Sequence, residues 1–187
     1  MIKKILKWSA IVLAVGLIII QLVRPARTNP AIDASKTLQT HVQVPGDVDA
    51  ILKRACNDCH SHETKWPWYS NVAPVSWLVV YDVNEARSHL NFSEWGSYDE
   101  GRADKKLDEI EEEVEHGKMP LPIYLFMHAE AKLSDEDKRI LQDWARGERN
   151  RLKQDKEAAG DEADEKKGED DDGSGKGRGR GRGGRGQ

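Results

Sequence analysis

The sequence contains only two cysteines, and both lie within one five-residue stretch of the 187-residue chain. A framework of several disulfides, typical of small secreted proteins, is therefore excluded. Long apolar runs are equally scarce. One lies near the N-terminus, and the chain has no second run of similar hydrophobicity that could cover it. No stretch alternates apolar and polar residues as a half-buried strand does. Together these absences predict an all-α protein with one small helical domain.

The single apolar run extends from Ile5 to Val23 and follows a short segment that carries lysines. Its 19 residues correspond to a helix of roughly 28 Å, close to the hydrocarbon thickness of a membrane, about 30 Å. We therefore expect residues 1–23 to form a signal-anchor, a single transmembrane helix in a bacterial inner membrane. A cleaved signal peptide is the alternative, although no A-x-A-like site precedes Arg24.

Composition divides the rest of the chain into three parts. Residues 24–46 hold three prolines and no sustained periodicity, which predicts a tether. Residues 47–150 carry helical apolar patterns and are expected to form the folded domain. Residues 151–187 are first acidic and then rich in arginine and glycine, without an apolar face, so we expect them to be disordered. Such a tail resembles RNA-binding segments, but outside the cytoplasm no nucleic-acid partner is expected.

About four helices are expected in the domain, since apolar residues recur every three or four positions in several stretches. Gly117 suits the position just after a helix end, and Ser134 with Asp137 has the spacing of a capping box. The expected spans are 47–55, 74–90, 102–116 and a last helix that begins after Ser134. A domain of about 100 residues is small for a self-sufficient core, so a large apolar cofactor would help to fill it.

The two cysteines belong to the stretch Cys56-Asn57-Asp58-Cys59-His60. Two thiols one helical turn apart can each add to a vinyl group of the same porphyrin, and His60 is then placed to bind the iron. This pattern is typical of the covalent attachment of a c-type haem. The helix before the motif and the export segment both favour this interpretation, since haem is attached on the extracytoplasmic side of bacterial membranes. We therefore expect one covalently bound haem c in the periplasm.

Three other interpretations of the motif remain. A thioredoxin-like redox pair needs a βαβ context, for which the sequence gives no sign. A zinc site needs two further ligands, and no two histidines have the H-x₃₋₅-H spacing. A chance occurrence is the third possibility, because five-residue motifs recur in unrelated proteins.

A haem iron bound by one histidine takes a second axial ligand or keeps an open site. Met119 is the leading candidate, because it follows a predicted helix and lies in a loop that prolines restrain. His128 is the alternative ligand, and a bis-histidine iron would have a lower reduction potential. Trp66 and Trp68 follow the motif closely and are expected to form part of the pocket wall, with plain core packing as the alternative.

Several further blocks accompany the motif, and with it they resemble the bacterial membrane-anchored haem-binding domain family. The blocks are CNDCHS (56–61), TKWPWYS (64–70), APVSWL (73–78), LNFS (90–93) and GKMPLPIY (117–124). The resemblance covers about residues 45–147. It implies a cytochrome-c-like domain with haem on Cys56 and Cys59, His60 as the proximal ligand, and Met119 in the loop that carries the distal methionine. It implies no defined reaction, and the charged tail lies outside it.

The favoured function is that of a membrane-tethered monohaem electron carrier in the periplasm, which serves an unknown redox partner protein. A haem-based sensor or interaction module is the alternative. A peroxidase-type enzyme is less favoured, because no distal His–Arg or His–Glu arrangement can be found in the sequence. Rapid binding of CO by the reduced protein would argue against the carrier and for the other two.

Overall fold

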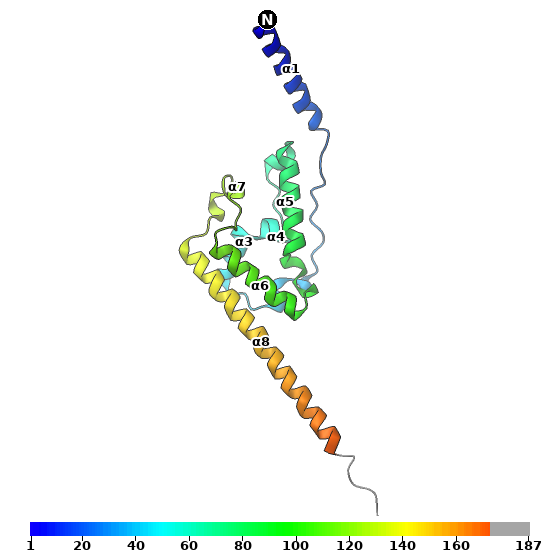
Figure 1. Ribbon diagram of the computed structural model, residues 1–187, viewed down its shortest axis with the longest axis vertical. Helices are drawn as coiled ribbons and strands as arrows, with labels where there is room; N and C mark the ends of the chain where they lie inside the picture. Colours follow the sequence, from blue (N-terminus) through cyan, green and yellow to red (C-terminus); the bar gives the residue numbers. More distant parts are fainter. Residues whose placement is uncertain (173–187) are drawn as a thin grey trace, which may run out of the picture. The chain divides into compact units, whose positions relative to one another are not determined.

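The computed structural model describes residues 1–172, and it describes their side chains as far as residue 158 (Figure 1). Every regular element in this part of the chain is helical, as the sequence predicted. The chain divides into two units, residues 1–149 and residues 150–187. In chain order the α-helices and short 3-10 helices (η) are α1 (Ile2–Ile20), η1 (Ala34–Lys36), α2 (Leu38–His41), α3 (Gly46–Ala55), α4 (Asn57–His60), η2 (Trp68–Asn71), α5 (Val75–His89), η3 (Phe92–Ser97), α6 (Glu100–Glu115), α7 (Pro122–Leu125), η4 (Ala129–Ala131) and α8 (Asp135–Asp172).

Helix α1 forms where the apolar run predicted a helix, but its role as a membrane span is not supported. Among the residues described, no helix is both long enough and apolar enough to cross a membrane. The transmembrane assignment of residues 1–23 is corrected accordingly: Lys3, Lys4 and Lys7 lie inside α1, so that charges occupy its first two turns. No residue of α1 is buried, and its large apolar side chains are exposed.

The core of the first unit is formed by the apolar stripes of α3, α6 and the first turns of α8. Polar contacts hold these helices together: Arg54 pairs with Asp137 at 2.9 Å, and the Trp144 Nε1 group donates to the carbonyl of Gln43 at 2.8 Å. The buried residues of the three stripes are Val48, Ile51, Leu52 and Ala55 on α3, Ala103, Leu107, Ile110 and Val114 on α6, and Leu141, Trp144 and Ala145 on α8.

Helix α6 ends as its sequence predicts, and this end positions the loop that follows. Gly117 has a φ of +64°, a conformation that favours glycine. Its N–H group donates to the carbonyl of Val114, and the N–H group of Lys118 donates to that of Glu113. These two bonds form a Schellman motif. The predicted capping box at the start of α8 is also present, with Ser134 and Asp137 bonded to each other in both directions.

Residues 21–32 bind along the domain, whereas we expected residues 24–46 to be a tether. The Gln21 side chain bonds both backbone groups of Ala73, at 2.9 and 3.0 Å, and the Trp77 Nε1 group donates to the carbonyl of Val23. The Arg87 guanidinium donates to the carbonyl of Thr28. Further along, Leu38 and Val42 are buried. The segment therefore bonds to the domain through its polar groups and does not form a free linker.

The expected disorder from residue 151 is also corrected. Helix α8 continues to Asp172, so the acidic stretch is helical as far as the structure describes it. Glutamate, lysine and alanine are strong helix formers, which gives this stretch its helical preference in spite of its charge. Disorder was also expected for the arginine- and glycine-rich residues 173–187, which lie outside the described residues.

Candidate functional site

The two cysteines lie at the junction of two helices. Helix α3 ends at Ala55, the backbone breaks from helical geometry at Cys56, and α4 then carries Cys59 and His60. The N–H groups of Cys59 and His60 both donate to the carbonyl of Cys56, which closes one turn and brings the two cysteines to the same turn. Both thiols are free and partly exposed. Burial raises the pKa of Cys56 to about 12 and that of Cys59 to about 11, so both are neutral thiols.

His60 is oriented by the backbone that follows α5. Its Nδ1 atom lies 3.0 Å from the carbonyl oxygen of Leu90, to which it donates. A ring that donates from Nδ1 carries its lone pair on Nε2, the nitrogen that can bind a metal. Burial lowers the pKa of His60, which favours the neutral imidazole that metal binding requires. The ring of Phe92 lies 6.1 Å from that of His60, centroid to centroid.

Residues after the motif hold it through a chain of polar contacts. The Ser61 hydroxyl donates to the carbonyl of Asn57 at 2.8 Å, and the backbone N–H group of His62 donates to the hydroxyl of Ser93 at 2.9 Å. Asn91 donates to the Nε2 atom of His62 at 3.0 Å. These partners are buried, so the contacts are shielded from water. These bonds fix the segment that follows the motif.

Asp58 connects the motif to a distant part of the chain. One carboxylate oxygen accepts from the backbone N–H group of Lys65 at 3.0 Å, and the other accepts from the Tyr124 hydroxyl at 3.0 Å. Tyr124 lies on α7, so this bond joins α4 to the segment that follows Met119. Burial, followed by the charge of Asp58, raises the pKa of Tyr124, so its hydroxyl stays protonated and donates.

Met119 and His128 lie at opposite ends of the segment that contains α7. Met119 is half-buried, and its N–H group donates to the carbonyl of Glu113 as part of the turn that ends α6. His128 has a partner at each ring nitrogen: Nε2 lies 2.8 Å from the Tyr69 hydroxyl, and Nδ1 lies 3.1 Å from a carboxylate oxygen of Glu130. Its ring also stacks on that of Tyr124, with the centroids 4.2 Å apart.

Trp66 and Trp68 do not share one environment. The Trp66 Nε1 group donates to Asn29 at 3.2 Å, so this residue contacts the N-terminal segment that binds along the domain. Trp68 is mostly exposed and packs edge-on against Tyr69, with the ring centroids 5.8 Å apart. Their assignment to the wall of a haem pocket stays a prediction.

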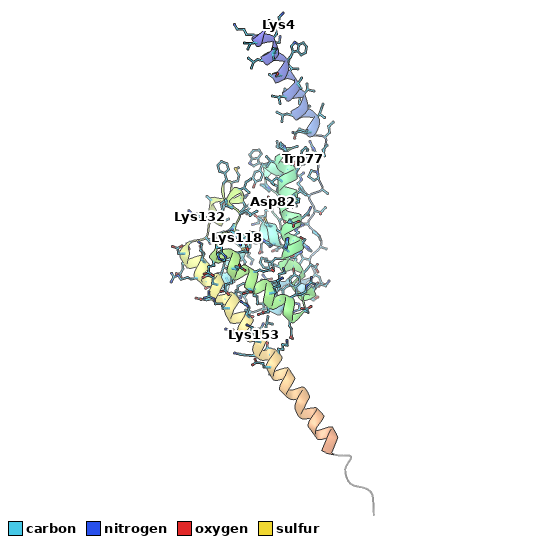
Figure 2. All side chains as sticks on the ribbon, viewed as in Figure 1. Lys4, Trp77, Asp82, Lys118, Lys132 and Lys153 are labelled. Atoms are coloured by element: carbon cyan, nitrogen blue, oxygen red, sulfur yellow. The ribbon has the colours of Figure 1, made fainter. Side chains whose placement is uncertain are left out.

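Charges on α4 and α5 act on the Cys59 thiol. Burial raises the pKa of Cys59 most, followed by the charges of Asp58 and of Asp82 on α5. Asp82 is labelled in Figure 2, further along α5 than Trp77. Large apolar side chains on α5 are exposed, among them Leu78 one turn before Asp82. Exposed apolar side chains of this kind are the surface that a large apolar group would cover.

The opposite face of α4 is different in character. A cavity of about 450 Å³ lies there, and its lining includes the polar residues Asn57, Ser61 and Ser93 but neither cysteine nor His60. The zinc interpretation of the motif also finds no support. In the part of the chain that the structure describes, no group of three or more histidine, cysteine, aspartate or glutamate side chains is arranged to hold a metal ion.

Asp58 and Tyr124 are the residues of this site that sequence reasoning missed. Asp58 occupies a variable position of the motif, and its spacing alone predicts no partner 66 residues away. Tyr124 lies in one of the blocks that carry the family resemblance, and its place in that block was the available signal.

Comparison with known proteins adds one finding. A family profile described as a haem-binding domain matches residues 15–147, well over half of the chain. The match includes the motif, Met119 and His128, and it begins before the segment that binds along the domain. No curated protein and no solved structure matches the chain. The chain is a member of the haem-binding domain family.

Proposed function

We propose that this protein carries one haem c, attached covalently through Cys56 and Cys59, with His60 as the proximal iron ligand. The observation that carries the proposal is the geometry of His60. Its Nδ1 atom donates to Leu90, which leaves the Nε2 lone pair for iron beside two free thiols on the same turn. Family membership supports haem as the cofactor.

The thiols suit the attachment chemistry. Each S–H group could add across one vinyl group of such a haem: a C–S bond would form, the hydrogen would go to the other vinyl carbon, and no external oxidant or reductant would be consumed. The chain has two cysteines, which is the number that one haem requires. The exposed apolar side chains of Leu78 and Met127 could cover the porphyrin and exclude water from it.

We assign the second axial position to Met119 and keep His128 as the alternative. Both ring nitrogens of His128 already have partners, Tyr69 and Glu130, and ligation would break one of these contacts. Among the residues that the structure describes, none makes such a competing bond to the Met119 sulfur, and the turn that ends α6 fixes the backbone of Met119. A methionine ligand stabilises the ferrous state and raises the reduction potential.

Given two axial ligands, the role we propose is electron transfer in a cytochrome-c-like domain of bacterial origin. The domain works on the extracytoplasmic side of the inner membrane and exchanges electrons with a partner protein. Helix α1 attaches it to that membrane, since its apolar side chains are exposed along its whole length. Three lysines near its start can interact with anionic headgroups.

The test of this role is CO binding by the reduced holoprotein, because a carrier with both axial positions filled excludes CO. We expect no rapid change in the absorption spectrum when CO is added to the wild-type protein. Met119→Ala opens the site and is expected to bind one CO per haem. Stoichiometric and rapid CO binding by the wild-type protein would contradict electron transfer and favour a sensor.

A further inference from the structure

A set of exposed apolar side chains gathers at one end of the domain, and we call it the apolar rim: Trp68, Val72, Val75 and Phe126. These side chains are 71%, 44%, 44% and 86% exposed. Three of them lie at η2 and the start of α5, and the fourth lies just after α7. Figure 1 shows α7 and the start of α5 at the same end of the domain. The bond between Tyr69, which follows Trp68, and His128, two residues after Phe126, joins the two parts.

The apolar rim adjoins the end of α1. Gln21, the C-cap of α1, bonds both backbone groups of Ala73, which lies between Val72 and Val75. The indole of Trp77 donates to the carbonyl of Val23 at 2.8 Å, a second contact at the same level. Any surface that holds the end of α1 therefore lies beside the apolar rim.

Charge is distributed unevenly between this end of the domain and helix α6. Residues 64–81 and 121–129, which include the apolar rim, contain no aspartate or glutamate, and Glu130, which pairs with His128, directly follows the second of these ranges. Residues 99–115, which include α6, contain nine acidic residues against three basic ones. An apolar surface with few acidic residues suits a membrane that carries negative charge.

We infer that the apolar rim docks the domain on the surface of an anionic lipid bilayer, next to the point where α1 is attached. This inference rests on the proposed attachment of α1 to a membrane. The rim tryptophan and phenylalanine enter the headgroup region, a position that aromatic side chains favour. The side-chain contacts of Gln21 and Trp77 keep the domain from turning relative to α1, so the thiol side of α4 keeps one orientation toward the membrane.

The depth of single side chains in the bilayer tests this inference. A nitroxide is placed on the full-length holoprotein at Phe126→Cys, and in a separate protein at Lys105→Cys on α6 as the matched control. Cys56 and Cys59 are occupied by haem, so only the introduced thiol reacts. The proteins are bound to phosphatidylglycerol vesicles with the haem reduced. Collision with oxygen and with a water-soluble nickel complex then reports depth, and flotation of the vesicles reports attachment.

We expect the label at position 126 to lie about 5–10 Å into the headgroup and acyl boundary, and the label at position 105 to remain in water. If both labels stay in water while the protein floats with the vesicles, docking of the rim is overturned and the attachment of α1 stands. If the protein does not float, the proposed attachment fails and the inference fails with it. Dipolar broadening between labels at position 126 would show contact between two copies and would also overturn it. A label at Val72→Cys repeats the test at the end of η2.

Discussion

The two sides of the proposed haem space are built in different ways. On the motif side, His60 donates to Leu90, and the neighbouring polar groups are buried and bonded to one another. On the other side, residues 119–131 form only short helices, and Ile123 and Met127 are exposed. The motif side is therefore shaped by its own contacts, whereas the other side depends on a few tyrosine and histidine contacts and on the group it covers. A site of this kind can present a fixed proximal ligand before the cofactor is in place.

The largest expected effect comes from removing the ligand on the motif side. His60→Ala takes away the proximal nitrogen, so we expect loss of the low-spin absorption spectrum and of reversible reduction, even where haem stays attached. Optical spectra and a redox titration of the purified protein measure this. His116→Ala, which alters an exposed histidine at the end of α6, serves as the control and should change neither property. An unchanged spectrum in His60→Ala would show that the motif side does not bind the iron.

The next largest effect is expected on the opposite side and separates its two candidate ligands. Met119→Ala should lower the reduction potential, because a methionine ligand favours the ferrous state. His128→Ala should leave the potential close to that of the wild type, since that ring bonds to Tyr69 and Glu130. Redox titration of both variants decides between them. A low potential in His128→Ala with a normal one in Met119→Ala would move the assignment to His128.

Stability measurements compare the packing of the two regions. Leu107 on α6 is fully buried, so Leu107→Ala is expected to cost about 2–5 kcal/mol of unfolding free energy. Ile123 is 60% exposed on α7, and Ile123→Ala is expected to cost less than about 1 kcal/mol. Denaturant unfolding of the two holoproteins gives both values. Equal losses of unfolding free energy would show that residues 119–131 are packed as tightly as the core, and would contradict the proposed difference between the two sides.

A smaller effect is expected at the bond that joins the two sides. Tyr124→Phe removes the hydroxyl that donates to Asp58, and a bond to a charged group contributes about 1.5–3 kcal/mol. Hydrogen exchange should become faster in residues 119–131 and stay unchanged in residues 56–64. Tyr81→Phe, a change at an exposed tyrosine of α5, is the matched control. Equal exchange in Tyr124→Phe and in the control would mean that the bond does not hold α7.

Much of the helical fold could be predicted from local sequence signals. The stripe of Val48, Ile51 and Leu52 predicted α3, and the end of α6 at Gly117 and the capping box at Ser134 were also predicted. Each of these signals acts over one or two helical turns, where backbone sterics and burial determine the structure.

Contacts between distant residues were the part that could not be predicted. Gln21 binds Ala73, and Arg87 binds Thr28, although nothing in residues 24–46 signals a partner. The apolar residues Val75 and Leu78 of the predicted helix 74–90 are exposed, since periodicity cannot say what covers a face. The same limit applied to Asp58 and Tyr124, whose pairing follows from tertiary structure alone.

The central claim is that Cys56 and Cys59 bind one haem covalently, and a pyridine haemochrome spectrum combined with intact mass tests it most directly. The wild-type protein is extracted with acidified acetone, which removes haem that is not covalently bound, and is then measured. We predict that one haem per chain remains and that the haemochrome spectrum is that of a haem with both vinyl groups converted to thioethers. The double variant Cys56→Ser and Cys59→Ser should lose its haem in the extraction. Haem that is extracted from the wild-type protein, or retained by the double variant, would contradict the account.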